Sequence, residues 1–266
     1  MERPIGIFDS GIGGLTVVRE IVRNLPHEDL VYFGDTARVP YGTKSPQTVI
    51  KFSIENALFL LRFRVKLIVV ACNTSSSYGL SILKNNFKVP VIGVINPGAE
   101  EAVKATKNGR IGVIGTNATI NSGAYEREIK NINPRLEVFS RACPLFVPLV
   151  EEGWLSEKVT REVAAKYLKP LKDKKIDTLI LGCTHYPLLK KIIRGVMGGA
   201  VTLIDSARQV AMHVKEVLAW EDIASQGRKK PQYEFYVSDE SEKFSQIANR
   251  LLNRRVRLIR KDIEYV

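Results

Sequence analysis

The sequence predicts an α/β fold with two pseudo-symmetric domains, each a mostly parallel sheet flanked by helices. Two observations support this prediction. Short apolar runs rich in β-branched residues alternate with amphipathic stretches, and the second part of the chain repeats the first. Alternation of strands and helices is typical of parallel sheets that carry helices on both faces. A chain of 266 residues with 45% hydrophobic content can form one large or two small packed domains.

The first part of the chain contains four runs that we expect to be buried strands: Ile5–Phe8, Leu30–Phe33, Leu67–Ala71 and Val91–Val94. The stretch from Ser45 to Phe63 predicts a helix, because Ser45 can cap its start and Pro46 suits its first turn. We expect its broad apolar face to consist of Val49, Phe52, Ile54, Leu58 and Leu61.

Four segments of the second part echo these strands in the same order. IGIFDS at Ile5 is matched by IGVIGT at Ile111, and LVYFGD at Leu30 by LEVFSR at Leu136, both at an offset of 106. LIVVACNT at Leu67 is matched by LILGCTH at Leu179, at an offset of 112, or 111 when Cys72 and Cys183 are aligned. PVIGVINP at Pro90 is echoed loosely by AVTLIDSA at Ala200. The near-constant spacing predicts two related domains.

Turn residues indicate where the chain passes from one domain to the other. Asn96-Pro97-Gly98 is expected to end a strand at the first boundary, and a second crossing is expected near Ser206. The predicted domains are therefore 1–97 plus 208–266, and 98–207, with an active-site cleft between them. The C-terminal segment, expected to rejoin the first domain, is predicted to contain a helix at Gln209–Ala219, a strand at Tyr233–Val237 and a final helix from about Ser241.

Composition favours a soluble, cytoplasmic protein. The N-terminus lacks the pattern of a signal peptide, and the longest apolar runs are too short to span a bilayer. Three widely spaced cysteines without a CxxC pair argue against a disulfide scaffold or a zinc knuckle. The net charge of +12 is consistent with a nucleic-acid partner or an acidic substrate. Since the basic residues are spread along the chain, we favour a solvated basic surface.

Polar residues follow the predicted strands, where α/β proteins place their active sites. Two of the three cysteines, Cys72 and Cys183, occupy matching positions in the repeat. In the first part these polar residues are Asp9, Ser10, Asp35, Tyr41, Gly42, Cys72, Asn73 and Thr74; in the second they are Cys143, Glu151, Glu152, Cys183, Thr184 and His185.

Two thiols at matching positions allow four interpretations. A disulfide is disfavoured in the cytosol, and two cysteines with one histidine leave a metal site short of ligands. They can also be two unrelated buried cysteines. The fourth interpretation is acid–base chemistry on both faces of one carbon, in which a thiolate removes a proton and a thiol on the opposite face supplies one. Such a pair would invert a stereocentre without a cofactor.

The neighbours of Cys72 and Cys183 are compatible with that chemistry. Both cysteines precede predicted helix starts, with Thr74–Ser76 and Thr184 as candidate caps, and a helix N-terminus lowers a thiol pKa from its free value of about 8.5. His185 can exchange protons with Cys183. The carboxylates of Asp9 and Glu151 can orient an ammonium group or polarise the thiols, although Asp9 can equally be only a helix cap.

The glycine-rich segment GIGG at Gly11–Gly14 follows a predicted strand and opens a predicted helix. A dinucleotide fingerprint would need glycine at position 16, where this chain has Thr16. Nucleotide binding is therefore disfavoured, and we expect the N–H groups of this loop to hold a carboxylate instead.

The segments FDSGIGG, YGTK, ACNTSS, CPLFVPLVEEG and LGCTHYP together resemble the bacterial glutamate racemases, over nearly the full chain up to about Ala219. The resemblance implies cofactor-independent proton transfer at Cα that interconverts L- and D-glutamate, with D-glutamate supplied to peptidoglycan synthesis and cell-wall biogenesis. It implies that Cys72 and Cys183 are the proton donors and acceptors. Asp9, His185 and a glutamate of the LVEEG motif, which we assign to Glu151, would assist them. Implied substrate contacts are Asp9, Ser10, Tyr41, Gly42, Asn73, Thr74, Thr184 and His185.

The same resemblance implies a homodimer. We expect no metal, no membrane partner and no nucleic acid as the primary partner. A structural role is expected for Cys143, which belongs to the CPLF segment and has no counterpart in the first part of the chain. Three alternatives remain open: an aspartate racemase of the same superfamily, a basic nucleic-acid-binding protein, and a thiol redox protein in which Cys72 and Cys183 form a disulfide on oxidation. The sequence also leaves open whether Glu151 or Glu152 faces the site, and it assigns no role to the basic C-terminal segment.

Overall fold

A computed structural model describes residues 3–227, 229–240 and 242–261 of the chain. It divides the chain into two compact units, residues 1–94 with 207–266 and residues 95–206. We expected the crossings at 97/98 and 207/208. These domain bounds stay a prediction. In the parts of the chain that the structure describes, no helix has the length and apolar character needed to cross a membrane.

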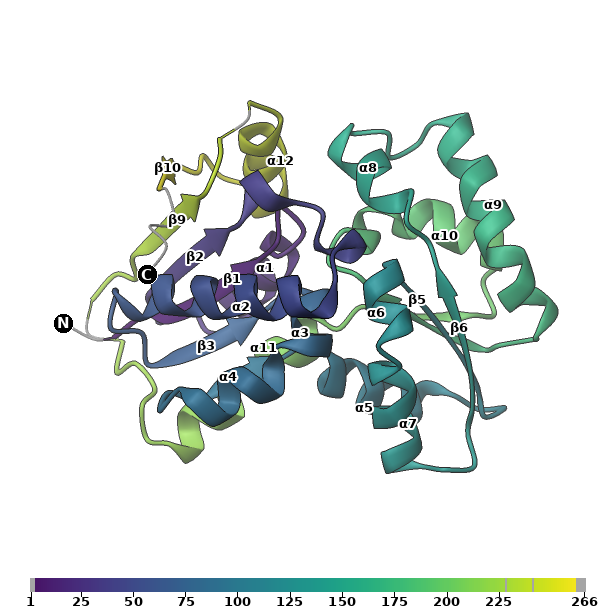
Figure 1. The fold of residues 1–266 in the computed structure, drawn as a ribbon, viewed down its shortest axis with the longest axis horizontal. Coiled ribbons are helices and arrows are strands. Elements are labelled where there is room, and N and C mark those ends of the chain that lie inside the picture. Colours follow the sequence, from purple (N-terminus) through teal and green to yellow (C-terminus); the bar gives the residue numbers. More distant parts are fainter. Residues whose placement is uncertain (1–2, 228, 241, 262–266) are drawn as a thin grey trace. The chain divides into compact units, whose positions relative to one another are not determined.

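The first unit contains a six-stranded sheet with the strand order β10-β9-β2-β1-β3-β4, and every registered strand pair is parallel (Figure 1). All residues of β1, β2 and β3, three of its four inner strands, are buried, as expected for a parallel sheet flanked by helices. The strands are β1 (Ile5–Asp9), β2 (Leu30–Gly34), β3 (Leu67–Val70), β4 (Val91–Gly93), β9 (Tyr233–Val237) and β10 (Leu258–Arg260).

The second unit contains a four-stranded parallel sheet with the order β6-β5-β7-β8. Its first strand in the chain, β5, lies between the next two, as β1 does in the first sheet. The order of four strands is therefore the same in both units, and the predicted pair of similar α/β sheets is confirmed. The strands are β5 (Arg110–Gly115), β6 (Glu137–Ala142), β7 (Thr178–Gly182) and β8 (Thr202–Ile204).

The strand registers correct one of the repeat offsets. Ile5 pairs with Leu30 in the first sheet and Ile111 pairs with Val138 in the second, so the offset of the second strand is 108 (138 − 30) rather than 106. Leu136 lies just before β6. A shift of two residues leaves each side chain on the same face of a strand, so the two segments show the same hydrophobic pattern at either offset. For the third strand the registers support an offset of 111.

Helices flank both sheets (Figure 1). Those of the first unit are α1 (Leu15–Asn24), α2 (Pro46–Leu61), α3 (Asn73–Tyr78), α4 (Leu80–Asn86), α11 (Ala207–Trp220) and α12 (Glu242–Leu252), with the short 3₁₀ turns η1 (Thr36–Arg38) and η2 (Tyr41–Thr43). Those of the second are α5 (Ile95–Ala105), α6 (Asn117–Asn121), α7 (Ala124–Ile132), α8 (Phe146–Glu151), α9 (Lys158–Asp173), the 3₁₀ turn η3 (Tyr186–Leu189) and α10 (Lys190–Met197).

The helix α2 begins as predicted, and its buried face agrees in part with the expected one. Val49 is buried, and the half-buried residues packed against the apolar clusters include Phe52, Ile54 and Leu61. Ser45 caps the helix by accepting a hydrogen bond from the N–H of Thr48. Leu58, expected to be buried, is 39% exposed. Two polar residues, Ser53 and Asn56, belong to the buried face, so a prediction based on apolar residues alone omitted them. The buried residues of α2 are Val49, Ser53, Asn56, Ala57, Phe59 and Leu60.

The expected turn at Asn96-Pro97-Gly98 is wrong, because these residues lie in the first turn of α5, directly after β4. Proline is well tolerated in a first helical turn. A side chain on Gly98 would place its Cβ 3.2 Å from the Cβ of Ser206, so this glycine permits close packing.

The C-terminal segment rejoins the first sheet, as expected. β9 pairs with β2, and β10 pairs with β9. β10 was not predicted; it lies within the basic cluster Arg254–Lys261 and forms the edge of the sheet. Ser241, the expected start of the last helix, lies outside the described residues, and α12 is described from Glu242.

Candidate active site

The two candidate cysteines lie at equivalent places, each after the carboxyl end of a strand that neighbours the first strand of its sheet. In the first unit Asp9 ends β1, and Cys72 follows β3. In the second unit Cys183 directly follows β7, whose neighbour β5 ends at Gly115. The strand order reverses direction at β1 and at β5, and ligands of open α/β sheets bind at such switch points.

Cys72 is buried, with 5% of its surface exposed, and its thiol donates a hydrogen bond to Oγ of Ser10 at 3.6 Å. Its side chain packs with Tyr41 and Val49 in a small apolar cluster. Burial and, after it, the negative charge of Asp9 raise the pKa of the Cys72 thiol to about 11. Cys72 therefore holds its proton in the free protein at neutral pH.

The carboxylate of Asp9 binds the glycine-rich loop that follows it. Its Oδ2 accepts hydrogen bonds from the backbone N–H groups of Gly11 at 3.1 Å and Gly14 at 2.9 Å. These loop N–H groups do hold a carboxylate, but it belongs to the chain itself. Asp9 therefore fixes the start of α1, as a cap does, and also lies close enough to Cys72 to act on its pKa.

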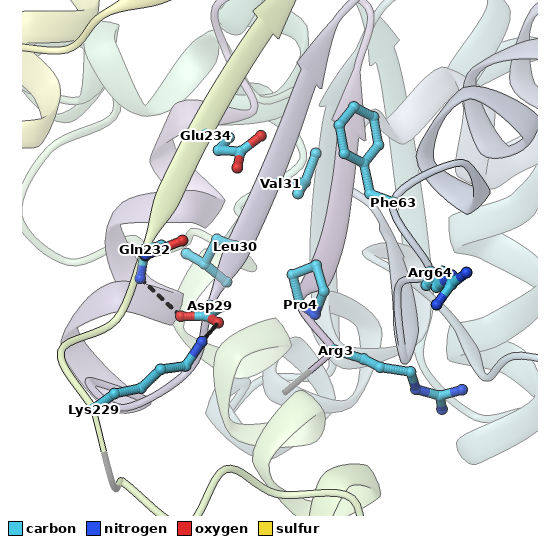
Figure 2. Close-up of a pocket in the computed structure, with 10 residues that line it drawn as sticks. All are labelled: Arg3, Pro4, Asp29, Leu30, Val31, Phe63, Arg64, Lys229, Gln232 and Glu234. Carbon is cyan, nitrogen blue, oxygen red and sulfur yellow. Dashed lines mark hydrogen bonds and ion pairs between the residues drawn. The ribbon is translucent and has the colours of Figure 1, made fainter. Parts of the chain in front are cut away.

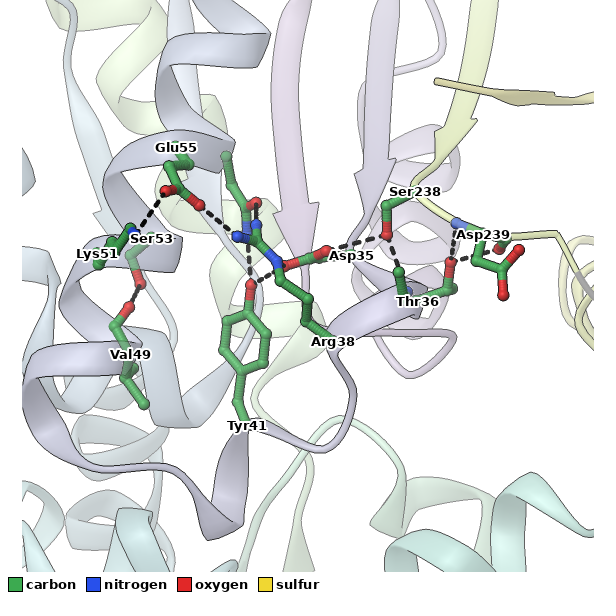
Figure 3. Close-up of polar contacts among 12 residues, drawn as sticks. Asp35, Thr36, Arg38, Tyr41, Val49, Lys51, Ser53, Glu55, Ser238 and Asp239 are labelled. Atoms are coloured by element: carbon green, nitrogen blue, oxygen red, sulfur yellow. Dashed lines mark hydrogen bonds and ion pairs between the residues drawn. The ribbon is translucent and has the colours of Figure 1, made fainter. Parts of the chain in front are cut away.

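Tyr41 is buried, and its hydroxyl donates to Asp35 and accepts from Nδ2 of Asn56 at 3.0 Å (Figure 3). Burial and the charge of Asp35 raise the pKa of Tyr41 well above its usual value. The hydroxyl of Tyr41 is therefore held between Asp35 and Asn56. Gly42 is buried next to Tyr41 in η2.

In the second unit a histidine connects a thiol with a carboxylate. Nδ1 of His185 lies 3.8 Å from Sγ of Cys183, and Nε2 lies 2.6 Å from Oε1 of Glu151. Burial lowers the pKa of His185, but its hydrogen bonds with Cys183 and Glu151 outweigh burial and raise the pKa well above the usual value. This Cys–His–Glu series of contacts can pass a proton to or from the sulfur.

Glu151 ends α8, while Glu152 follows it and is exposed. Of the two glutamates, Glu151 makes the contact with His185. The sequence alone left this choice open, because the two adjacent carboxylates differ only in the direction that the end of a short helix gives them.

Asn73, Thr74 and Thr184 are buried next to the two cysteines. The expected capping roles are wrong for Thr74–Ser76, because α3 begins at Asn73 and these residues lie inside it, with Cys72 in the capping position. Cys183 is followed by a turn and then by η3, whose capping position is occupied by His185. Thr184 therefore lies in the turn between β7 and η3.

Cys143 has the surroundings of a structural residue. It is fully buried in the apolar core of the second unit, and burial raises its pKa to about 12. Its carbonyl accepts a hydrogen bond from the hydroxyl of Tyr186 at 2.8 Å. All three cysteines are free thiols.

One polar residue at a strand end was missed by the sequence reasoning. Thr116 directly follows β5, is buried, and accepts a hydrogen bond from the N–H of Thr119 at 3.2 Å. The repeat contained the signal, since Thr116 stands in IGVIGT where Ser10 stands in IGIFDS.

A cavity of about 470 Å³ lies at the amino ends of the strands of the first sheet, opposite the carboxyl ends that carry the candidate residues (Figure 2). Its lining includes Pro4, which precedes β1, and Gln232, which precedes β9. Its Asp29 is bound by Lys229 at 2.8 Å and by the N–H of Gln232 at 2.7 Å. None of its lining residues is a cysteine or histidine.

Residues 3–227, 229–240 and 242–261 contain no group of three or more His, Cys, Asp or Glu side chains placed to hold a metal ion.

Known proteins resemble this chain over nearly its whole length. The model of the Asp/Glu/Hydantoin racemase family matches residues 5–215. The chain belongs to this family. It is 52% identical to the glutamate racemase of Geobacter metallireducens, over 94% of this chain and 93% of that relative.

Solved racemase structures share the fold. A glutamate racemase isoform of Bacillus anthracis matches with a TM-score of 0.94 and 41% identity, over 98% of this chain and 97% of that one. The glutamate racemase of Francisella tularensis in complex with D-glutamate matches with a TM-score of 0.93 and 42% identity, over 99% and 98%. The resemblance to glutamate racemases is confirmed, and the chain is an amino-acid racemase by family. The family match includes every residue of the candidate site.

Proposed function

We propose that this protein racemises glutamate by two-base proton transfer at Cα, with Cys72 and Cys183 as the two bases. The observation that carries the proposal is that each sheet places one buried cysteine after the equivalent strand, at its switch point. The family membership supports racemisation, and the glutamate racemases that the chain matches support glutamate as the substrate.

In this mechanism one sulfur, as a thiolate, removes the Cα proton from one face of glutamate. The other sulfur, as a thiol, delivers its own proton to the opposite face. The bond from Cα to its hydrogen breaks on one side and forms on the other, so the stereocentre inverts and the thiol and thiolate exchange roles. Because the two enantiomers mirror each other, the reverse reaction uses the same pair in the opposite order.

Residues next to the two thiols would control the protonation state of each thiol. His185, held by Glu151, would exchange a proton with Cys183. Asp9 opposes the ionisation of Cys72 in the free protein, so a substrate ammonium next to Asp9 would offset that charge and make proton loss from Cys72 easier. Substrate binding would thus prepare the first thiol for reaction.

The carbanion formed at Cα needs hydrogen-bond donors directed at the α-carboxylate, since no electron-sink cofactor takes part in this proposal. Asn73, Thr74 and Thr184 are the candidate donors, each next to one of the thiols. Ser10, Tyr41 and Gly42 are proposed to complete the substrate contacts in the first unit.

The cellular role follows from the product. D-glutamate would supply peptidoglycan synthesis, in the cytoplasm, without a cofactor. We propose a homodimer, as the resemblance implies.

The first experiment incubates the purified protein with L-glutamate in deuterated buffer without added cofactor. Loss of the Cα–H signal by NMR, together with decay of circular dichroism to zero, is expected. L-Aspartate is assayed in parallel. Exchange of aspartate without glutamate would replace the proposed substrate, and exchange of neither would remove the proposed racemase activity.

The cysteines are tested individually. Cys72→Ala and Cys183→Ala should each reduce racemisation by at least about a hundredfold, because general acid–base groups commonly contribute that much. Any remaining deuterium uptake should be confined to one enantiomer, opposite for the two variants, since each retains one base. Cys143→Ala is the matched control and should keep near wild-type turnover. Wild-type turnover in either site variant would contradict the two-base mechanism.

A further inference from the structure

The loop after β9 is bonded to the loop after β2, although the two are about two hundred residues apart in the sequence (Figure 3). Oγ of Ser238 donates to Oδ1 of Asp35 at 2.9 Å and accepts from the N–H of Ala37 at 2.9 Å. The N–H of Asp239 donates to Oγ1 of Thr36 at 2.8 Å, and that hydroxyl donates to the carbonyl of Asp239. Four hydrogen bonds therefore connect the two loops.

Asp35 transmits this connection towards the candidate site. Its side chain is fully buried, and besides Ser238 it accepts from Nε of Arg38 at 2.6 Å and from the hydroxyl of Tyr41. A buried carboxylate keeps its orientation only while donors satisfy both oxygens. Ser238 serves Oδ1, while Arg38 and Tyr41 serve Oδ2.

Tyr41 in turn packs beside Cys72, the proposed catalytic thiol of the first unit. Its ring packs with Cys72 and Val49, and η2, which begins at Tyr41, contacts α3, the helix that follows Cys72. Arg38 belongs to the same network, since its guanidinium binds Asp35, Glu55 and Asn56. These bonds make Arg38 a support for the loop.

We propose that Ser238 is a positioning residue for Cys72, which acts by holding Asp35 and thereby the ring of Tyr41 against the thiol. This proposal rests on the proposed function, because it gives the C-terminal segment a role in the same site. Without the Ser238 hydroxyl, Oδ1 of Asp35 loses its donor and Ala37 loses its acceptor. The carboxylate can then turn, and Tyr41, bonded to the other oxygen, loosens from Cys72.

The test is Ser238→Ala, with Ser238→Thr as the variant that keeps a hydroxyl. Ser225→Ala is the matched control: it removes a serine hydroxyl from the same C-terminal segment, one that accepts a hydrogen bond from the backbone N–H of Gly227 at 3.3 Å. Each protein is treated with iodoacetamide at fixed pH, and the alkylation rates of Cys72 and Cys183 are followed by peptide mass spectrometry.

Cys72 and Cys183 are 5% and 6% exposed, so Cys183 serves as the internal reference. In Ser238→Ala the rate ratio of Cys72 to Cys183 should rise by about fivefold, the factor that loss of one net hydrogen bond commonly causes. Ser238→Thr and Ser225→Ala should keep the wild-type ratio. An unchanged ratio in Ser238→Ala, or equal acceleration at both cysteines, would overturn the proposal, because equal acceleration indicates general loosening.

Kinetics provide the second readout. Ser238→Ala should lower kcat for glutamate by about fivefold with little change in KM, since the thiol and not the substrate is displaced. In the double variant with Tyr41→Phe, the loss of kcat should be smaller than the product of the two separate losses, because both changes act through Asp35. Additive effects would contradict that route. If the wild-type protein does not racemise glutamate, the proposed function fails while the alkylation ratio still decides the positioning role.

Discussion

The two candidate bases occupy equivalent positions and have different neighbours. Cys72 lies near a carboxylate and a serine, whereas Cys183 lies near an imidazole that a second carboxylate holds. The repeat in the sequence singled out both cysteines, and His185 was singled out because it lies two residues after Cys183. The sequence motifs did not distinguish Glu151 from Glu152, since that choice depends on where α8 ends relative to His185.

Glu151→Gln tests the histidine. Burial lowers the pKa of His185, and the contacts with Cys183 and Glu151 reverse that effect, so removing the carboxylate charge should lower the pKa. NMR titration of the three histidines in wild type and variant measures it. Glu152→Gln, the neighbouring exposed glutamate, is the control. An unchanged titration of His185 in Glu151→Gln would contradict the assignment.

The same pair predicts a pH-dependent stability. A histidine pKa raised in the folded state stabilises the fold fully below the unfolded value of about 6.5, and the contribution is lost as pH rises through the folded value. Wild type should therefore lose more stability over this window than Glu151→Gln does. Urea unfolding at a series of pH values measures the difference. Parallel stability curves would show that Glu151 does not raise the pKa of His185.

At the scale of secondary-structure elements, the turn from β1 into α1 places Asp9. Gly14 has an ordinary helical φ of −59°, so it is required for space and not for conformation. A Cβ on Gly14 would lie 2.4 Å from the Cβ of Asp9. The glycine-rich pattern therefore accommodates an internal carboxylate. The sequence predicted that the N–H groups of this loop bind a carboxylate. It left open which carboxylate, because a glycine-rich segment shows that N–H groups are available but does not show what they bind.

Gly14→Ala should lower the free energy of unfolding by about 1–3 kcal/mol, the usual cost of overpacking, and reduce racemisation by displacing Asp9. Gly195→Ala is the matched control, since a Cβ at Gly195 in α10 meets nothing within 4 Å. It should raise stability by about 0.5–1 kcal/mol, the helix-interior advantage of alanine. Urea denaturation and turnover measure both. Equal effects of the two variants would contradict the steric argument.

At the scale of the whole molecule, a buried ion pair anchors the returning C-terminal segment to the first unit. Nζ of Lys66 lies 2.6 Å from Glu28, and both side chains are 4% exposed. Lys66 also donates to the carbonyl of Ile223 at 2.6 Å, and the N–H of Ser225 donates to Glu28 at 2.7 Å. These contacts tie the chain between α11 and β9 to the loops that enter β2 and β3.

Lys66→Met should cost about 3–5 kcal/mol of unfolding free energy, because it leaves the carboxylate of Glu28 buried without its cation. Lys158→Met is the control. Lys158 lies 3.8 Å from Glu162 with its side chain 92% exposed, and loss of such a surface pair costs less than about 1 kcal/mol. Chemical denaturation measures both variants. A cost for Lys66→Met no larger than that of the control would show that the pair does not anchor the segment.

Local patterns in the sequence were sufficient for every described strand except β10, and for the matching positions of the two cysteines after β3 and β7. Apolar runs mark buried strands, and the motifs around Cys72 and Cys183 keep their neighbours adjacent in the chain. The packing of distant segments determined the rest: the polar stripe of α2 at Ser53 and Asn56, and the bond from Ser238 to Asp35. Periodicity shows which side of an element is apolar, but contacts between distant residues depend on strand order and packing, which no local pattern records.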